Sequence, residues 1–357
     1  MEMPEELSPR RLWRRLIEFA LVGAVIVFLV LTLPGLGNLR SDIAHASGGW
    51  LVVGVVLEVG SALCYVVIFR AVFCQRMNWR LSYQIGMAEQ GANSVLSVSG
   101  AGGLALGAWA LNRAGMDTEY IARRTVAFFF LTSLANVGVL IVFAALYATG
   151  VLQHDRDPPL TYAFGGLAVL ATAIVVLGLP RLRPPAASPV PGSGVIARGI
   201  WFVRQSLGQG VRDGLQMLRH RPLAILAGSL GVMGFDLAVL GVCFKAFGYS
   251  PAVGMLALGY LIGQLGGNIP IPGGILGLDA GLIGTFALYH LPLAATTAAV
   301  LVYHAISLWV PGLLGSIAFV RLRRTLRRET EPAAMCAPLA EPLETVRLPV
   351  RAGAGAS

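Results

Sequence analysis

The segment GGNIPIPGG, residues 266–274, separates two apolar stretches that are each too short to cross a bilayer comfortably. Proline removes a backbone hydrogen-bond donor and glycine costs helix stability, so a helix that reaches this segment is expected to break there. Broken helices at membrane depth usually line a cavity that is enclosed by protein or filled with water. The segment therefore predicts a re-entrant helical hairpin.

The composition places the chain in a membrane. Of its 357 residues, 56% are hydrophobic and only 13% are charged. Several apolar runs reach the roughly 20 residues that cross a bilayer as a helix. The predicted fold is an all-α polytopic membrane protein with two left-over apolar stretches, 84–111 and 252–291. Full spans are expected in six ranges: 16–36, 49–73, 122–148, 161–180, 222–247 and 293–320.

Basic residues indicate how these stretches are threaded, because cytoplasmic loops near span ends are enriched in Lys and Arg. If 84–111 is a hairpin that opens to the cytoplasm, the arginines on both sides of it lie inside. If 252–291 is a second hairpin that enters from the outer face, the arginines of the linker and the tail also lie inside. Both termini are then cytoplasmic, in an inner (cell) membrane. The net charge of +9 follows from this topology and from anionic lipid headgroups as partners, without nucleic acid.

This threading makes the two halves of the chain inverted copies, each consisting of a span, a hairpin and a span. Inverted repeats with broken helices are a recurring design for alternating access, so transport is the leading class of function. The linker permits an amphipathic helix, which either tethers the halves at the membrane surface or regulates them. We expect four regions: a first membrane half (1–183), a basic cytoplasmic linker (184–221), a second membrane half (222–324) and a disordered cytoplasmic tail (325–357).

Four carboxylates fall within the predicted membrane segments: Glu58, Glu89, Asp236 and Asp279. A charge at the bilayer centre costs at least ~2.5 kcal/mol on insertion scales, so such residues are functional candidates. A cavity that carries them can bind a cationic headgroup or exchange protons, while the N-termini of the hairpin helices can hold a lipid phosphate. The alternative is that each carboxylate makes a structural hydrogen bond or pairs with a nearby basic residue.

Four side-chain amides lie in the hairpins, and they have two interpretations. They either satisfy backbone groups that are freed where the helices break or line a path for a lipid headgroup. These amides belong to Gln90, Asn93, Gln264 and Asn268.

Tyr303 and His304 follow the second hairpin. The pair either forms a polar relay beside the hairpin or completes packing hydrogen bonds. The helix breaks are assigned to glycines and prolines of the two hairpins, namely Gly102, Gly103, Pro270, Pro272, Gly273 and Gly274.

Several short motifs in the second half carry a resemblance: PIPGG (270–274), GLDA (277–280), LVYH (301–304) and RLRR (321–324). With them, residues 264–324 resemble the C-terminal part of the lysylphosphatidylglycerol synthase transmembrane-region family, also called flippase-like membrane proteins. The segment SVSGAGG (97–103) is similar to the family's shorter upstream motif. Asp279 stands where many members carry Glu, and His304 stands where Arg is common. The soluble aminoacyl-transferase domain of lysyl-lipid synthases is absent, so the resemblance implies lipid translocation without lipid synthesis.

Enzyme motifs are missing from the sequence. There is no His-Glu-x-x-His, no Walker lysine motif and no Gly-x-Ser-x-Gly elbow, and the histidines lack metal-ligand spacing. We therefore expect no enzymatic activity, no metal and no cofactor. The expected function is translocation, or flipping, of a polar-headed lipid between leaflets. The alternatives are a non-transporting membrane scaffold or assembly partner and, ranked below it, an intramembrane lipid-modifying enzyme.

Overall fold

Long helices dominate the computed structural model. Four of the described helices are long and apolar enough to cross a membrane. The residues that can be described are 47–95, 101–149, 151, 166, 167, 169, 170, 172–178, 195–266 and 275–328, and they contain no strand. This part of the chain is an all-helical multi-pass membrane protein. The four long helices are α3 (Gly48–Phe73), α6 (Thr118–Ala148), α9 (Pro222–Ala246) and α12 (Leu293–Arg328).

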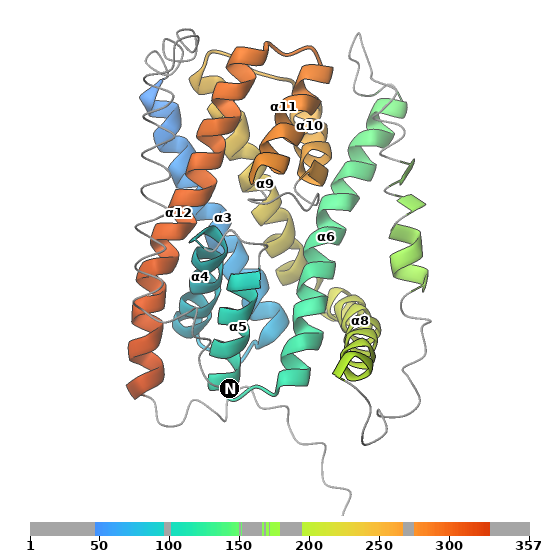
Figure 1. Cartoon of the computed structure of the whole chain (residues 1–357). Helices are drawn as coiled ribbons and strands as arrows, with labels where there is room; N and C mark the ends of the chain where they lie inside the picture. The colour runs from blue at the N-terminus through green and yellow to red at the C-terminus, as the bar shows by residue number, and fades with distance from the viewer. Residues whose placement is uncertain are drawn as a thin grey trace, which may run out of the picture.

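Two pairs of short helices lie between the long ones, and the two helices of each pair pack against each other. The first pair is α4 (Trp79–Val95) with α5 (Ala101–Arg113), and the second is α10 (Val253–Gly266) with α11 (Ile275–Leu288). Figure 1 shows α4 and α5 in the lower half of the bundle and α10 and α11 in the upper half. Each half of the chain thus runs long helix, short pair, long helix, with the short pairs at opposite ends.

Several predicted features lie outside the described residues. They include the first span (16–36), most of the span at 161–180 and the two breaks at 96–100 and 267–274, with Asn268, Pro270, Pro272, Gly273 and Gly274. Within 161–180 the structure describes a short π-helix, η2 (Ile174–Gly178). Gly102 and Gly103 lie in the first turn of α5 rather than in the break before it. Helix α12 runs to Arg328, eight residues beyond the predicted end of the last span, because its charged C-terminal end continues past the apolar segment.

Glycines set how closely the helices approach. A Cβ atom added to Gly228 of α9 would lie 2.6 Å from Cβ of Ile68 on α3. At the crossing of α4 and α12, a Cβ on Gly91 would lie 2.7 Å from Cα of Gly315, and one on Gly315 would lie 2.5 Å from Cα of Gly91. Small residues let helix backbones meet where lipid offers no hydrophobic advantage to association. The backbone contact therefore holds α4 firmly against α12.

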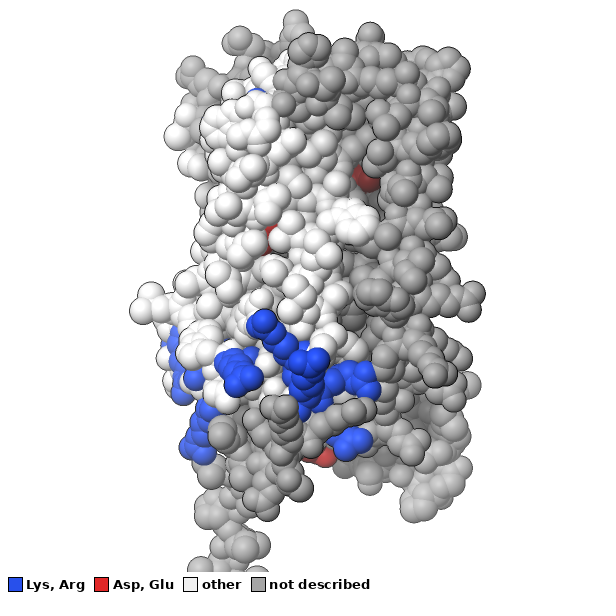
Figure 2. Space-filling view, turned by 90° about the vertical axis from the view of Figure 1, so that its left-hand side faces the viewer, with Lys and Arg blue, Asp and Glu red and all other residues white. Residues whose placement is uncertain are grey.

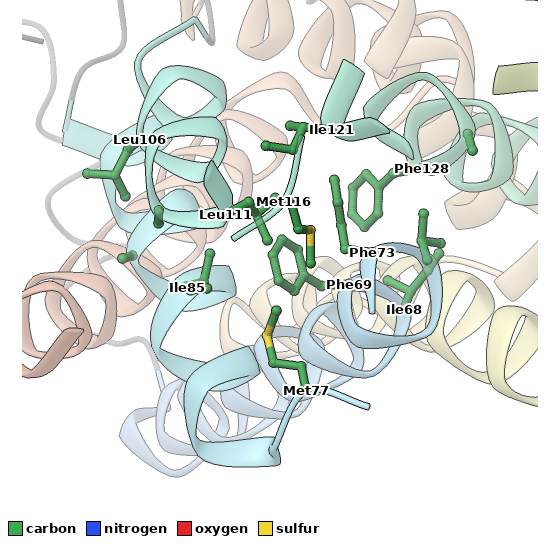
Figure 3. Packing of buried hydrophobic residues seen from close by; sticks show 14 of the residues in the cluster. Ile68, Phe69, Phe73, Met77, Ile85, Leu106, Leu111, Met116, Ile121 and Phe128 are labelled. Carbon is green, nitrogen blue, oxygen red and sulfur yellow. The ribbon is translucent and has the colours of Figure 1, made fainter. Parts of the chain in front are cut away.

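The two largest hydrophobic clusters of the described residues each surround one short pair. In the first, side chains of α3, α4, α5 and α6 converge, and Figure 3 shows Phe69 and Phe73 facing Leu111 and Met116. The ring centroids of Phe69 and Phe73 are 4.7 Å apart. In the second, α9, α10, α11 and α12 pack around Phe244 and Phe286, whose centroids are 5.1 Å apart in an edge-on arrangement. Each short pair is thus part of its own packed core.

Charges separate along the bundle axis. The C-terminal ends of α3, α5 and α12 meet the N-terminal ends of α4, α6 and α9 at one end, which helix α8 (Val195–His220) crosses (Figure 1). Figure 2 shows Lys and Arg in a band in the lower half of one face, with a largely uncharged surface above it. We call this the arginine-rich end. The arginines at this end whose side chains the structure describes are Arg70, Arg76, Arg80, Arg113, Arg123, Arg124, Arg212, Arg219, Arg221, Arg321, Arg323 and Arg324.

Lys245 lies at the opposite end, where α9 finishes beside the start of α3. Its ammonium nitrogen is 5.0 Å from the ring centroid of Trp50, and the backbone N–H of Ser47 donates to the carbonyl oxygen of Ala246 over 3.0 Å. An uncharged belt between polar ends is what a bilayer requires of a spanning bundle.

Helix α8 is tied to α6 by polar contacts. Gln205 Nε2 donates to Glu119 Oε1 over 2.8 Å, and Arg123 Nη1 donates to Gln209 Oε1 over 3.3 Å. Arg123 also approaches Asp213 at 4.0 Å. The linker helix thus joins the base of α6 directly to the start of α9.

Candidate functional site

A carboxylate near the middle of α9 organises the site. The Tyr260 hydroxyl on α10 donates a short hydrogen bond to Asp236 Oδ2. The Tyr303 hydroxyl on α12 donates to the same oxygen over 3.1 Å. Both tyrosines are buried, and their ring centroids are 6.4 Å apart in an edge-on arrangement. Asp236 therefore holds three helices of the second half together at one oxygen atom.

Glu58 of α3 adds a second carboxylate from the first half. It is only 5% exposed, and it is close enough to Asp236 for the two charges to interact. One turn away, the Ser61 hydroxyl donates to the carbonyl oxygen of Val232 over 3.4 Å, which shows that α3 and α9 run side by side here. Glu58 Oε2 is buried without a hydrogen-bond partner among the described residues. The site thus holds an acidic oxygen that is free to receive a donor.

A second acidic contact joins α11 to α12. Asp279 Oδ1 lies 3.0 Å from His304 Nδ1. The same oxygen has no well-aligned hydrogen-bond donor in the described part of the chain. His304 Nε2 is also buried without a described partner. Tyr303 and His304 are successive residues of a helix, so their side chains leave α12 about 100° apart and reach the two different aspartates.

Three of the four membrane carboxylates, Glu58, Glu89 and Asp236, have no positively charged partner in the described part of the structure. Its ion pairs are Arg123 with Asp213 and His304 with Asp279, and neither involves Glu58, Glu89 or Asp236. The predicted alternative that these three carboxylates pair with basic residues therefore finds no support there. Buried carboxylates without a cation are costly unless they are protonated or a ligand brings positive charge.

Glu89 occupies a separate place in the first half. It is 5% exposed on α4, and Tyr65 of α3 is its hydrogen-bonding neighbour. A Cβ on Gly107 of α5 would lie 2.5 Å from Glu89 Oε2, so the missing side chain leaves room for the carboxylate. The described contacts do not connect Glu89 with Asp236 or Asp279. The structure thus brings together Glu58, Asp236 and Tyr303, places Asp279 beside His304 in a second contact, and leaves Glu89 apart from both.

The side-chain amides of the short helices differ in their hydrogen-bond partners. Asn93 Oδ1 accepts a hydrogen bond from the backbone N–H of Gly103 over 3.1 Å, so a side chain of α4 caps the first turn of α5. The first N–H groups of a helix have no partner within it, which makes such a cap necessary in a dry interior. Gln264 is a hydrogen-bonding neighbour of Tyr260. Gln90 Oε1 is buried and has no described partner.

Sequence reasoning missed Tyr65 and Tyr260. Isolated tyrosines in apolar helices are read as packing or interfacial residues, and neither tyrosine belongs to a motif. One signal was present for Tyr260, because it lies four residues before Gln264 and hence on the same face of α10. Tyr65 had no comparable signal, since its carboxylate partner comes from the next helix.

The described part of the chain does not gather potential metal ligands into one cluster. No cluster of three or more His, Cys, Asp or Glu side chains there could hold a metal ion.

The fold and the site define a polytopic helical membrane protein with acidic groups enclosed by its helices. Residues 15–315 match the family described as the lysylphosphatidylglycerol synthase TM region, and the chain belongs to this family. The family resemblance of the sequence motifs is thereby confirmed. Over 93 residues the chain is also 39% identical to a UPF0104 membrane protein of Methanothermobacter thermautotrophicus. That match covers 26% of each chain, so it spans about a quarter of the length of this curated relative.

Proposed function

We propose that this protein moves a polar-headed lipid between the two leaflets of a cell membrane, without a chemical step on the lipid. The observation that carries the proposal is the enclosed group of Glu58, Asp236, Tyr260 and Tyr303, which joins α3, α9, α10 and α12. Polar groups within a membrane bundle mark pathways for polar cargo, because lipid-facing positions cannot hold them. Family membership supports the class of substrate.

The short helix pairs are re-entrant hairpins in this proposal. They enter the membrane from opposite faces and return, so the two halves form an inverted repeat with six spans in all. Such repeats commonly place a substrate site at their interface, and alternating access results when one half rocks against the other. Glu58 comes from the first half and Asp236 from the second, so the site lies where such an interface would be. A cationic group in the lipid headgroup would supply the positive counter-charge that these carboxylates lack.

The arginine-rich end faces the cytoplasm in the proposed topology, with both termini on that side of an inner membrane. Its arginines contact anionic headgroups, which attract basic residues by about 1 kcal/mol each near the surface. Accessibility labelling of single cysteines placed in the turns after α3 and α9 tests this orientation. The first turn should label from the cytoplasmic side and the second from the outer side.

The test of function is leaflet accessibility of labelled lipids in proteoliposomes that contain the purified protein. Anionic, zwitterionic and lysyl-modified lipids are compared, with empty liposomes as the baseline. Translocation above the baseline that depends on the headgroup supports the proposal and identifies the substrate class. No translocation of any lipid by folded protein, with and without a proton gradient, contradicts it and favours a membrane scaffold.

Asp279→Asn is the diagnostic variant for the second acidic contact. It keeps the size of the side chain but removes the charge that faces His304, so we expect slower translocation by a protein that still folds. Thr285→Val is the matched control on the same helix, because the Thr285 hydroxyl donates to the carbonyl oxygen of Gly281 over 2.7 Å and has no other hydrogen bond among the described residues. Unchanged flipping in a stable Asp279→Asn protein would remove this residue from the pathway.

A further inference from the structure

An open pocket lies at the arginine-rich end, away from the acidic site. It has a volume of about 470 Å³ and is formed where the end of α3 and the start of α4 meet the junction of α8 and α9. Its polar lining comes from Arg70, Gln75, Trp79, His220 and Arg221, and its other lining residues are apolar. None of the lining residues is acidic.

Arg70 is held in place within this pocket. Its Nε donates to the carbonyl oxygen of Met77 over 2.8 Å, and its Nη2 makes a short hydrogen bond to the carbonyl oxygen of Gln75. The guanidinium carbon also lies 4.5 Å from the ring centroid of Trp79. The positive charge is therefore fixed at the pocket wall, while none of its described partners is an anion.

Arg221 and His220 supply further donors opposite this wall. Both side chains are exposed, and neither has a hydrogen bond or ion pair among the described residues. The N-cap position of α9 is Arg221 itself, which makes no side-chain cap. Pro222 has no N–H, so the N–H groups of Leu223 and Ala224 are the donors of the first turn that lack a partner within the helix. Two arginines and the His220 imidazole line one pocket without an acidic residue in its described lining, which favours an anionic ligand.

The apolar part of the pocket shows what kind of anion fits. Leu223 is 83% exposed, which is the largest exposure of any large hydrophobic side chain that the structure describes. It stands at the start of membrane helix α9, with Val67 of α3 also in the lining. Trp79 is 55% exposed, as is common for tryptophans at a membrane interface. A soluble anion would leave Leu223 uncovered, whereas an acyl chain would cover it.

We propose that this pocket binds an anionic phospholipid of the leaflet at the arginine-rich end. The phosphate contacts Arg221 and His220 beside the fixed charge of Arg70, and one acyl chain lies along Leu223 and Val67. Basic pockets between membrane helices are suited to acidic lipid headgroups. This lipid is a bound partner that joins the α8–α9 junction to the turn after α3, and it is distinct from the lipid that is moved.

Native mass spectrometry of the full, delipidated chain in neutral detergent tests the proposal. The probes are dioleoyl-phosphatidylglycerol and, for comparison, dioleoyl-phosphatidylcholine. Arg221→Gln should weaken phosphatidylglycerol binding roughly tenfold, because one charge-assisted contact is lost. The matched control is Arg324→Gln, which removes an exposed arginine at the same end but outside the pocket. It should change the affinity by no more than about twofold, as expected for a screened surface charge.

His220→Gln is the second variant, and it should also weaken phosphatidylglycerol binding while leaving phosphatidylcholine binding unchanged. Equal binding of phosphatidylglycerol by the wild type, Arg221→Gln and His220→Gln would overturn the proposal. An equal loss in Arg324→Gln would also overturn it, because it would show a general attraction without a site. Full competition by soluble glycerol phosphate would contradict the acyl-chain contact. None of these outcomes depends on whether the protein flips lipids.

Discussion

The two halves of the bundle both pair a carboxylate with a tyrosine, but they place the partners on opposite helices. In the first half the tyrosine is on the long helix (Tyr65, α3) and the carboxylate is on the short one (Glu89, α4). In the second half the carboxylate is on the long helix (Asp236, α9) and the tyrosine is on the short one (Tyr260, α10). Both arrangements link a short helix to the long helix before it by a hydrogen bond.

The surroundings of the two pairs differ more than the pairs themselves. Asp236 has a second tyrosine donor and a neighbouring carboxylate, and Asp279 with His304 lies on the next two helices. Glu89 has one tyrosine and is enclosed by α5. In addition, α4 is packed backbone to backbone against α12 at Gly91 and Gly315. The first short pair is thus anchored to α12, and in the proposed function the second short pair contributes to the lipid path.

The largest expected effect comes from the anchor. Gly315→Ala would place its Cβ 2.5 Å from Cα of Gly91, so α4 and α12 must separate, at a cost of about 1–3 kcal/mol or more of unfolding free energy. Thermal unfolding in detergent measures this loss. Gly138→Ala on α6 is the control, since no atom lies within 4 Å of the added Cβ. Equal stability of the two variants would contradict the proposed anchor.

The number of tyrosine donors predicts a second difference. Tyr65→Phe should destabilise the protein by about 1–3 kcal/mol, because it leaves buried Glu89 without its donor. Tyr260→Phe should cost less, since Tyr303 still donates to Asp236. Equilibrium unfolding of both variants provides the comparison. A larger loss of stability for Tyr260→Phe would mean that the hydrogen bond from Tyr303 does not compensate for the one lost from Tyr260.

The halves should also differ in activity. Asp236→Asn is expected to slow lipid translocation roughly tenfold, because the loss of charge weakens the hydrogen bonds from both tyrosines and any contact with a cationic headgroup. Glu89→Gln should have a smaller effect, since Glu89 lies outside the group of residues around Asp236. The measurement is the initial rate of lipid flipping by each variant in proteoliposomes. Equal losses in two folded variants would indicate that both halves handle cargo.

The smallest expected effect concerns helix capping in the first short pair. Asn93→Ala removes the cap from the start of α5 and should cost about 1 kcal/mol of stability. Asn78→Ala is the comparison, because Asn78 Oδ1 accepts from Leu81 N over 2.7 Å at the exposed start of α4. Water can replace the exposed cap more readily than the partly buried one, so Asn78→Ala should cost less. Thermal unfolding of both variants tests this order.

Hydropathy located the long helices well because the requirement to cross a bilayer acts on each segment separately. Residues 49–73 were expected as a span and α3 covers Gly48–Phe73, while 222–247 were expected and α9 covers Pro222–Ala246. The end of α12 was less predictable. Polarity signals the membrane boundary, but a helix with good helix-forming residues can continue beyond it.

The candidate site was predicted residue by residue but not as a group. An ionisable residue in an apolar segment is conspicuous, so Glu58, Glu89, Asp236 and Asp279 could be selected from local context. Their partners could not be selected, because a tyrosine in an apolar helix has no distinguishing pattern. The pairing also depends on which helix faces meet, and that is decided by contacts such as Gly228 against Ile68.

The sequence by itself determined that this is a helical membrane protein, where its long helices lie and which polar residues are enclosed by apolar segments. These properties follow from local composition, since each segment must satisfy the bilayer independently. The tertiary structure alone decided that Glu58 joins Asp236, that Glu89 stands apart, and that Arg70 and Arg221 share a pocket. Those groupings arise from close packing between helices that are distant in the chain, and no local pattern encodes them.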